Sequence, residues 1–101
     1  MAISTAPCES CDFDPGIHRA VHVLQAAGVE TFESCQGGSD HSYPAPAVRF
    51  GVGRPEEGWK ALAVCLTFEF PVLRLRLCWD VEHGHVPTGP YWEIVFSKPL
   101  D

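Results

Sequence analysis

The most regular pattern in this chain reads Leu73-Arg74-Leu75-Arg76-Leu77-Cys78-Trp79-Asp80. Apolar and polar side chains alternate along the whole stretch, and this period of two predicts a β-strand that is buried on one side. The same alternation returns from Tyr91 to Ser97, where every second residue is apolar: Trp92, Ile94 and Phe96. The segment between the two stretches, residues 83–90, contains glycines and prolines and is expected to turn the chain.

Two other segments have the apolar spacing of helices. The first has Asp14 as its N-cap and ends at Gly28, so we place a helix at about 15–27. The second follows Pro55 and is expected to run to about Phe68. Both helices carry an apolar stripe, which means that each must pack against another layer.

Two further strands, at residues 29–34 and about 46–52, flank a long loop in the first half of the chain. The element order is therefore helix-strand-strand-helix-strand-strand. This order predicts an α+β fold (αββαββ) in which a four-stranded, mainly antiparallel sheet carries two helices packed on one face. We expect residues 1–13 to form an N-terminal arm and residues 14–101 to form a single α+β domain.

Side-chain parity divides the strand residues between two faces of the sheet. We expect one set to face the helices: Phe32, Val48, Phe50, Leu73, Leu75, Leu77, Trp92, Ile94 and Phe96. The other set is expected to point away from the helices: Glu33, Cys35, Arg49, Arg74, Arg76, Cys78, Asp80, Tyr91 and Glu93. Two interpretations of this outer face stay open, because its charged residues can pair across the strands or can bind a partner.

Composition limits the classes of function. A net charge of -6 disfavours binding to duplex nucleic acid, which depends on a basic surface. The longest apolar run, residues 61–66, is too short to span a bilayer, and residues 1–6 lack the pattern of a secretory signal. The five cysteines are an odd number in a chain without such a signal, which indicates reduced thiols. We expect a cytoplasmic protein that does not bind membranes.

The loop after the first strand gathers chemically active residue types. Together with the outer face it supplies our candidate binding residues: Glu33, Cys35, Gln36, Gly37, Gly38, His41, Tyr43, Arg49, Arg74, Arg76, Tyr91 and Glu93. As an alternative, Cys35 is a nucleophile with His41 as its base and Asp40 or Asp80 as the orienting carboxylate. In either case the glycines are expected to supply the positive φ angles of a turn.

A zinc site is a further alternative. Cys8 and Cys11 have the Cys-x-x-Cys spacing of half a zinc site, which Cys35 and His41 could complete, with His83 or His85 as substitutes. A tetrahedral site needs four converging ligands, and only two of these are close in the sequence. We therefore expect no cofactor and keep zinc as the alternative.

Four motifs resemble a group of small uncharacterised bacterial and phage proteins. They are GVETFESCQGG at 28–38, HSYPAPAVRF at 41–50, GWKALAV at 58–64 and PTGPYWE at 87–93. The resemblance covers about residues 16–96 and implies a phage or prophage origin without implying an activity. Separately, Ser34-Cys35-x-Gly37 is similar to the Ser-Cys-Ser-Gly turn of the wybutosine-synthesis methyltransferase family, although this chain lacks the arginine expected after the glycine.

These observations favour a small acidic binding protein that acts by contact with a protein partner, through the outer sheet face and the loop from Cys35 to Tyr43. The phage resemblance suggests an accessory role such as inhibition of a host defence system, including CRISPR machinery. One alternative is a small enzyme or ligand-binding protein for a nucleotide-like substrate, with Cys35, His41 and Arg49 lining the pocket. Another is a homodimer, stabilised by zinc or by burial of the same face.

Overall fold

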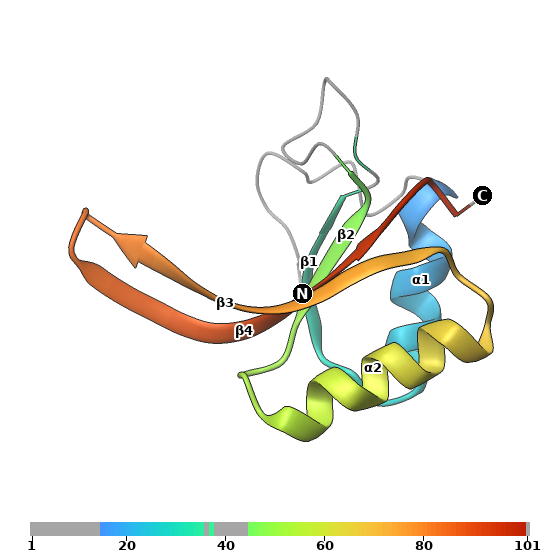
Figure 1. The fold of residues 1–101 in the computed structure, drawn as a ribbon, viewed down its shortest axis with the longest axis horizontal. Coiled ribbons are helices and arrows are strands. Elements are labelled where there is room, and N and C mark those ends of the chain that lie inside the picture. The colour runs from blue at the N-terminus through green and yellow to red at the C-terminus, as the bar shows by residue number, and fades with distance from the viewer. Residues whose placement is uncertain (1–14, 36, 38–44, 101) are drawn as a thin grey trace.

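The computed structural model describes residues 15–35, 37 and 45–100 of the chain (Figure 1). Its elements are, in order, α1 (Pro15–Ala26), β1 (Thr31–Cys35), β2 (Ala47–Phe50), α2 (Pro55–Thr67), β3 (Val72–Glu82) and β4 (Val86–Phe96). The strands form one sheet in the order β1-β2-β4-β3, and every neighbouring pair is antiparallel. The predicted α+β class and the order αββαββ are confirmed.

Both helices pack against the same face of the sheet. Ile17, Ala20 and Leu24 of α1 are fully buried, as are Ala61 and Cys65 of α2. They share one core with strand residues of a single parity: Val48, Phe50, Ile94 and Phe96. The apolar side chains on one face of the strands therefore pack against the apolar stripes of the helices, as the sequence predicts.

Each helix ends at a residue in the left-handed conformation. After α1, Gly28 has a φ of 89°, and the Val29 N–H donates to the Leu24 carbonyl at 3.0 Å. After α2, Glu69 takes the equivalent position with a φ of 59°. A left-handed residue of this kind satisfies the last carbonyls of a helix and reverses the chain. The second helix therefore ends before Pro71 is reached.

At two β-bulges the side chains do not follow the predicted alternation between the two faces of the sheet. The register of β1 and β2 shifts between Thr31 and Glu33, so that Phe32 is an extra residue on its strand. The ring of Phe32 consequently packs edge-to-face on Tyr91, with 5.5 Å between ring centroids, on the side away from the helices. Leu73 lies in a second bulge and is exposed. The predictions that Phe32 and Leu73 face the helices are therefore wrong.

The hairpin of β3 and β4 is longer than its sequence indicates. We predicted that the last strand starts at Tyr91, but β4 starts at Val86, and only residues 83–85 form the turn. The peptide bond between Gly89 and Pro90 is cis, next to a register shift between Cys78 and Asp80. Figure 1 shows the far part of this hairpin projecting well beyond the other two strands. We call residues 79–90 the arm; this name does not refer to the N-terminal arm expected at residues 1–13.

Candidate functional site

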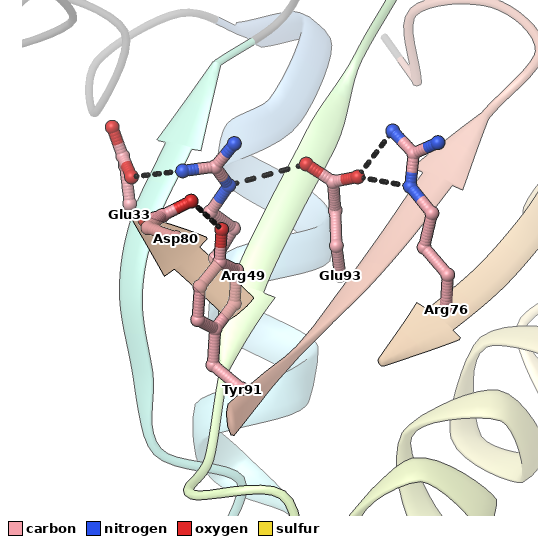
Figure 2. A network of polar contacts seen from close by, with 6 residues as sticks. All are labelled: Glu33, Arg49, Arg76, Asp80, Tyr91 and Glu93. Carbon is pink, nitrogen blue, oxygen red and sulfur yellow. Dashed lines mark hydrogen bonds and ion pairs between the residues drawn. The ribbon is translucent and has the colours of Figure 1, made fainter. Parts of the chain in front are cut away.

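A row of alternating charges crosses the outer face of the sheet. The register places Glu33 opposite Arg49, and Glu93 opposite both Arg49 and Arg76. Figure 2 shows the resulting ion pairs, with Arg49 Nη1 at 3.2 Å from Glu33 Oε1 and Arg49 Nε at 3.1 Å from Glu93 Oε2. Arg76 reaches the other oxygen of Glu93 through Nε and Nη2, both at 2.6 Å. We call these four residues the charged row.

Glu93 is the centre of the charged row. Its side chain is only 5% exposed, and each of its two oxygens accepts from a different guanidinium. Burying a carboxylate is costly unless it is paired and hydrogen-bonded, and here both conditions are met. The first interpretation of the outer face, ion pairing across the strands, therefore holds for Arg49 and Arg76.

Tyr91 joins the charged row to the base of the arm. Its hydroxyl donates to Asp80 Oδ1 at 2.9 Å, and the Arg49 guanidinium lies 5.2 Å from its ring centroid (Figure 2). Burial raises the pKa of the Tyr91 hydroxyl well above its ordinary value, and the hydrogen bond to Asp80 raises it further. Tyr91 thus stays neutral and acts as a hydrogen-bond donor.

The outer-face assignment is confirmed for the charged row and for Tyr91. Arg74 belongs to the same face, opposite Val95, and is exposed. Within the described part of the chain the Arg74 side chain makes no ion pair or hydrogen bond. Ala47 and Val95 also lie on this face by register but are buried, so the face is not uniformly open to water.

Most of the predicted loop lies outside the described residues. Gln36, Gly38, Asp40, His41 and Tyr43 belong to that part, so the predicted roles of these residues stay predictions. The backbone of Cys35 ends β1, opposite Ala47. Gly37 is described and has a φ of 86°, and a Cβ on it would lie 2.5 Å from the carbonyl carbon of Ala45. The prediction that a glycine here supplies positive φ is confirmed for Gly37.

The zinc alternative stays a prediction as well. Cys8 and Cys11 lie outside the described residues, as does His41. Among the residues that the structure describes, no group of three or more His, Cys, Asp and Glu side chains could hold a metal ion. Every predicted zinc ligand set includes residues beyond that part of the chain.

Two of the cysteines have described side chains, and neither is an activated nucleophile. Cys65 is fully buried, and burial raises its pKa to about 12. Burial also raises the pKa of Cys78, and the negative charge of Glu93 adds to the effect. Thiols react as thiolates, so both have reduced reactivity at neutral pH.

The arm leaves large apolar side chains in water. Trp92 marks the end of the helical cover, because its indole N–H donates to the Arg54 carbonyl at 2.8 Å and its ring packs on Gly58 of α2. Beyond that point Trp79 is 56% exposed and Val81 is 61% exposed. Leu77 pairs with Trp92 on the helix side but is also exposed, so its predicted burial is wrong.

We call the three exposed residues Leu77, Trp79 and Val81 the apolar strip. They occupy alternate positions of β3 and therefore share one side of the hairpin. The alternation predicts that this side meets another apolar layer, but the helices end before they reach the strip. No signal in the sequence separates the strip from the half-buried apolar positions of the same strand, such as Leu75.

A shallow cleft lies at the start of α2. It is lined in part by Gly28, Glu30, Gly51 and Lys60. Glu57, which also lines it, accepts from the backbone N–H of Val52 at 2.9 Å and of Arg54 at 2.8 Å and thereby holds the turn before the helix. This carboxylate is engaged in structure, and the mixed charges of the remaining lining do not define a class of ligand.

No helix among the described residues is long and apolar enough to cross a membrane. No protein-family model, no curated protein and no solved structure matches the chain.

Proposed function

We propose that this protein is a binding module that acts by contact with a protein partner, and that the apolar strip is its contact surface. One observation carries the proposal: Leu77, Trp79 and Val81 are exposed next to one another on a projecting hairpin (Figure 1). Contiguous exposed apolar residues on a soluble protein commonly mark an interaction site. Tryptophan is also among the residue types that contribute most to binding at protein interfaces.

The charges around the strip indicate the chemistry of the partner. Asp80 and Glu82 alternate with the strip residues and therefore point to the other side of β3, but the whole chain has a net charge of -6 that any approaching partner meets. We therefore expect a partner with an apolar pocket that is bordered by Lys or Arg side chains. Because exposed charges are screened by salt, association should slow as ionic strength rises.

The charged row supports the choice of the strip over the arginines of the outer face. The guanidinium groups of Arg49 and Arg76 already donate hydrogen bonds to the carboxylates of Glu33 and Glu93. A partner that recruited these guanidinium groups would have to replace ion pairs around a buried carboxylate, at considerable cost. We assign to the charged row the role of holding the base of the hairpin.

A narrower role follows from the resemblance to phage proteins. An accessory protein that blocks a host defence nuclease, including CRISPR machinery, would act by contact of this kind. The strip and the acidic net charge of the chain agree with such a role without selecting it. This narrower role stays a prediction.

The test is affinity capture from a lysate of the source organism with three baits. The first bait is the native protein, and the second carries Trp79→Ser with Val81→Ser in the strip. The third carries Trp59→Ser, a matched control because Trp59 of α2 is even more exposed, at 67%, but lies outside the strip.

We expect the native protein and the Trp59→Ser variant to retain the same stoichiometric partner, and the strip variant to lose it. Retention of that partner by all three baits would overturn the proposal. So would the absence of any stoichiometric partner on the native bait.

A further inference from the structure

The outer edge of β3 is the second unusual feature of the hairpin. Among the described strands, β3 is at the edge of the sheet and pairs only with β4. An edge strand presents a row of backbone N–H and C=O groups that can pair with another strand. Natural edge strands are commonly protected by lysine, proline or bulges; Val72–Glu82 contains neither lysine nor proline, and its one extra residue, Leu73, lies near its start, since the shift at Cys78 and Asp80 adds its extra residue to β4.

The charges of β3 are arranged with opposite signs on the two sides of Cys78. Arg74 and Arg76 lie before Cys78, and Asp80 and Glu82 follow it at the same spacing. An antiparallel copy of the strand would therefore present carboxylates to arginines along its length. This arrangement is complementary to itself, as the interface of a two-fold dimer must be.

We propose that two copies of this chain associate through antiparallel pairing of their β3 edges, with the two-fold axis at Cys78. In this register Arg76 lies opposite Asp80 of the second copy, and Arg74 lies opposite Glu82. On the other side of the sheet Leu77 meets Trp79, and Leu75 meets Val81. Each pairing joins opposite charges or apolar side chains, which are the favourable cross-strand combinations.

Neighbouring registers fit less well. Antiparallel pairing places directly opposed side chains on the same face of the sheet. The two-fold axis must therefore pass through a residue position of β3 and cannot lie between two residues. With the axis at Leu77, only Arg74 still meets an acidic residue, Asp80. With the axis at Trp79, only Arg76 does so, opposite Glu82. Two different arginine–carboxylate pairs form only when the axis is at Cys78.

The charged groups are available for this pairing. Arg74 and Glu82 are exposed and make no ion pair with any residue that the structure describes. Arg76 uses Nε and Nη2 on Glu93, and Asp80 uses Oδ1 on the Tyr91 hydroxyl. The remaining terminal nitrogen of Arg76 and Oδ2 of Asp80 can still bond across the interface.

The pairing would also change the contact surface. A two-fold axis perpendicular to the sheet keeps the helices of both copies on one side, so the two apolar strips would meet and form a single larger surface. The dimer is a separate inference from the proposed function, because an isolated arm could bind a partner equally well. Failure of the dimer would leave the capture experiment unaffected, since that experiment uses a different set of variants.

The first test is charge reversal, with molar mass in solution measured by light scattering over a range of protein concentrations. The native protein is expected to dimerise. Arg74→Glu and Glu82→Arg should each weaken the dimer by roughly tenfold or more, because each places like charges at two symmetric positions. Neither residue has an ion pair to lose within the described part of its own chain, so the fold should be preserved.

An equimolar mixture of the Arg74→Glu and Glu82→Arg variants should recover the dimer. In the mixed dimer, the carboxylate introduced at position 74 of one chain would face the guanidinium introduced at position 82 of the other. A native protein that is monomeric at every concentration would overturn the inference. A dimer that survives both single reversals would also overturn it, since the contact would then lie elsewhere.

A second test locates the two-fold axis. In a chain with Cys8, Cys11 and Cys35 replaced by serine, Cys78 is the remaining exposed or partly exposed thiol, because Cys65 is fully buried. Oxidation at alkaline pH, which offsets the raised pKa of the thiol, is expected to link Cys78 to its symmetry mate, and adding Cys78→Ser should abolish the link. A dimer that forms in solution but yields no Cys78 link would overturn the register.

Discussion

In both halves of the β3–β4 hairpin, β3 keeps the same alternation of apolar and polar residues, but its surroundings are very different. In the inner half, Leu75 packs against the core, and Glu93 lies buried in the charged row. In the arm, Trp79 and Val81 continue the same alternation, yet each residue is more than half exposed. The difference is whether a second layer lies over the strand.

This comparison indicates that one hairpin carries two roles. The helices cover the hairpin as far as Trp92, which packs on Gly58. The inner half is therefore part of the fold, and its substitutions should cost stability. The arm projects away from the rest of the domain, and its substitutions should affect binding instead. This division between a stabilising inner half and a binding arm can be tested by substitution.

Truncation of a core residue in the inner half should have the largest effect. Ile94 is fully buried between the helices and the sheet. Replacing a buried isoleucine by alanine removes apolar contacts and leaves a cavity, which costs about 2–5 kcal/mol. Val81→Ala in the arm is the matched control and should cost less than about 1 kcal/mol. Urea unfolding of both variants checks this difference, and equal losses would contradict the division.

Neutralising the buried carboxylate should have the next largest effect. Glu93→Gln removes the charge that pairs with Arg49 and Arg76, and we expect a loss of about 2 kcal/mol in the free energy of unfolding. Glu82→Gln on the arm, where the side chain is exposed, should change it by less than about 0.5 kcal/mol. A Glu93→Gln variant as stable as the native protein would show that the charged row does not hold the hairpin.

The ionisation of Tyr91 should report on the junction between the two halves. Its pKa in the folded state lies above the ordinary value of about 10, mainly because of burial. A raised pKa favours the neutral form, so this contribution to stability is complete below about pH 10 and is lost as the pH rises through the folded-state pKa.

Ultraviolet absorption of tyrosinate against pH, compared between the native protein and Tyr91→Phe, measures this ionisation. The late-titrating component should disappear in the variant. Asp80→Asn should lower the Tyr91 pKa only in part, because burial is the larger cause. If Tyr91 titrates at its ordinary pKa in the folded protein, then its hydroxyl is not buried where the inner half of the hairpin meets the arm, and this part of the account is wrong.

The sequence predicts much of the inner half correctly. The alternation of β3 and β4 assigns Arg76 and Glu93 to one face and Ile94 to the other, and the register confirms each assignment. Gly28 correctly marks the end of the first helix. These predictions succeed because period and backbone conformation are local properties that a short stretch of sequence determines.

The arm could not be predicted in the same way. Alternation shows that Trp79 and Val81 share a side, but it does not show whether a helix reaches that side. Pro87 and Pro90 also indicate a turn, because proline removes a donor from a strand. In a projecting two-stranded ribbon a proline can be accommodated where its strand has no second neighbour. The bulge at Phe32 likewise depends on pairing between strands and not on local preference.

The measurement that tests the division most directly is the free energy of unfolding of the Trp79→Ser/Val81→Ser variant. It should be made at low protein concentration, where self-association contributes little. We predict a value within about 1 kcal/mol of the native protein, because neither side chain is part of the core. A loss of more than about 2 kcal/mol would show that the arm stabilises the fold, and it would contradict the assignment of the apolar strip to partner binding.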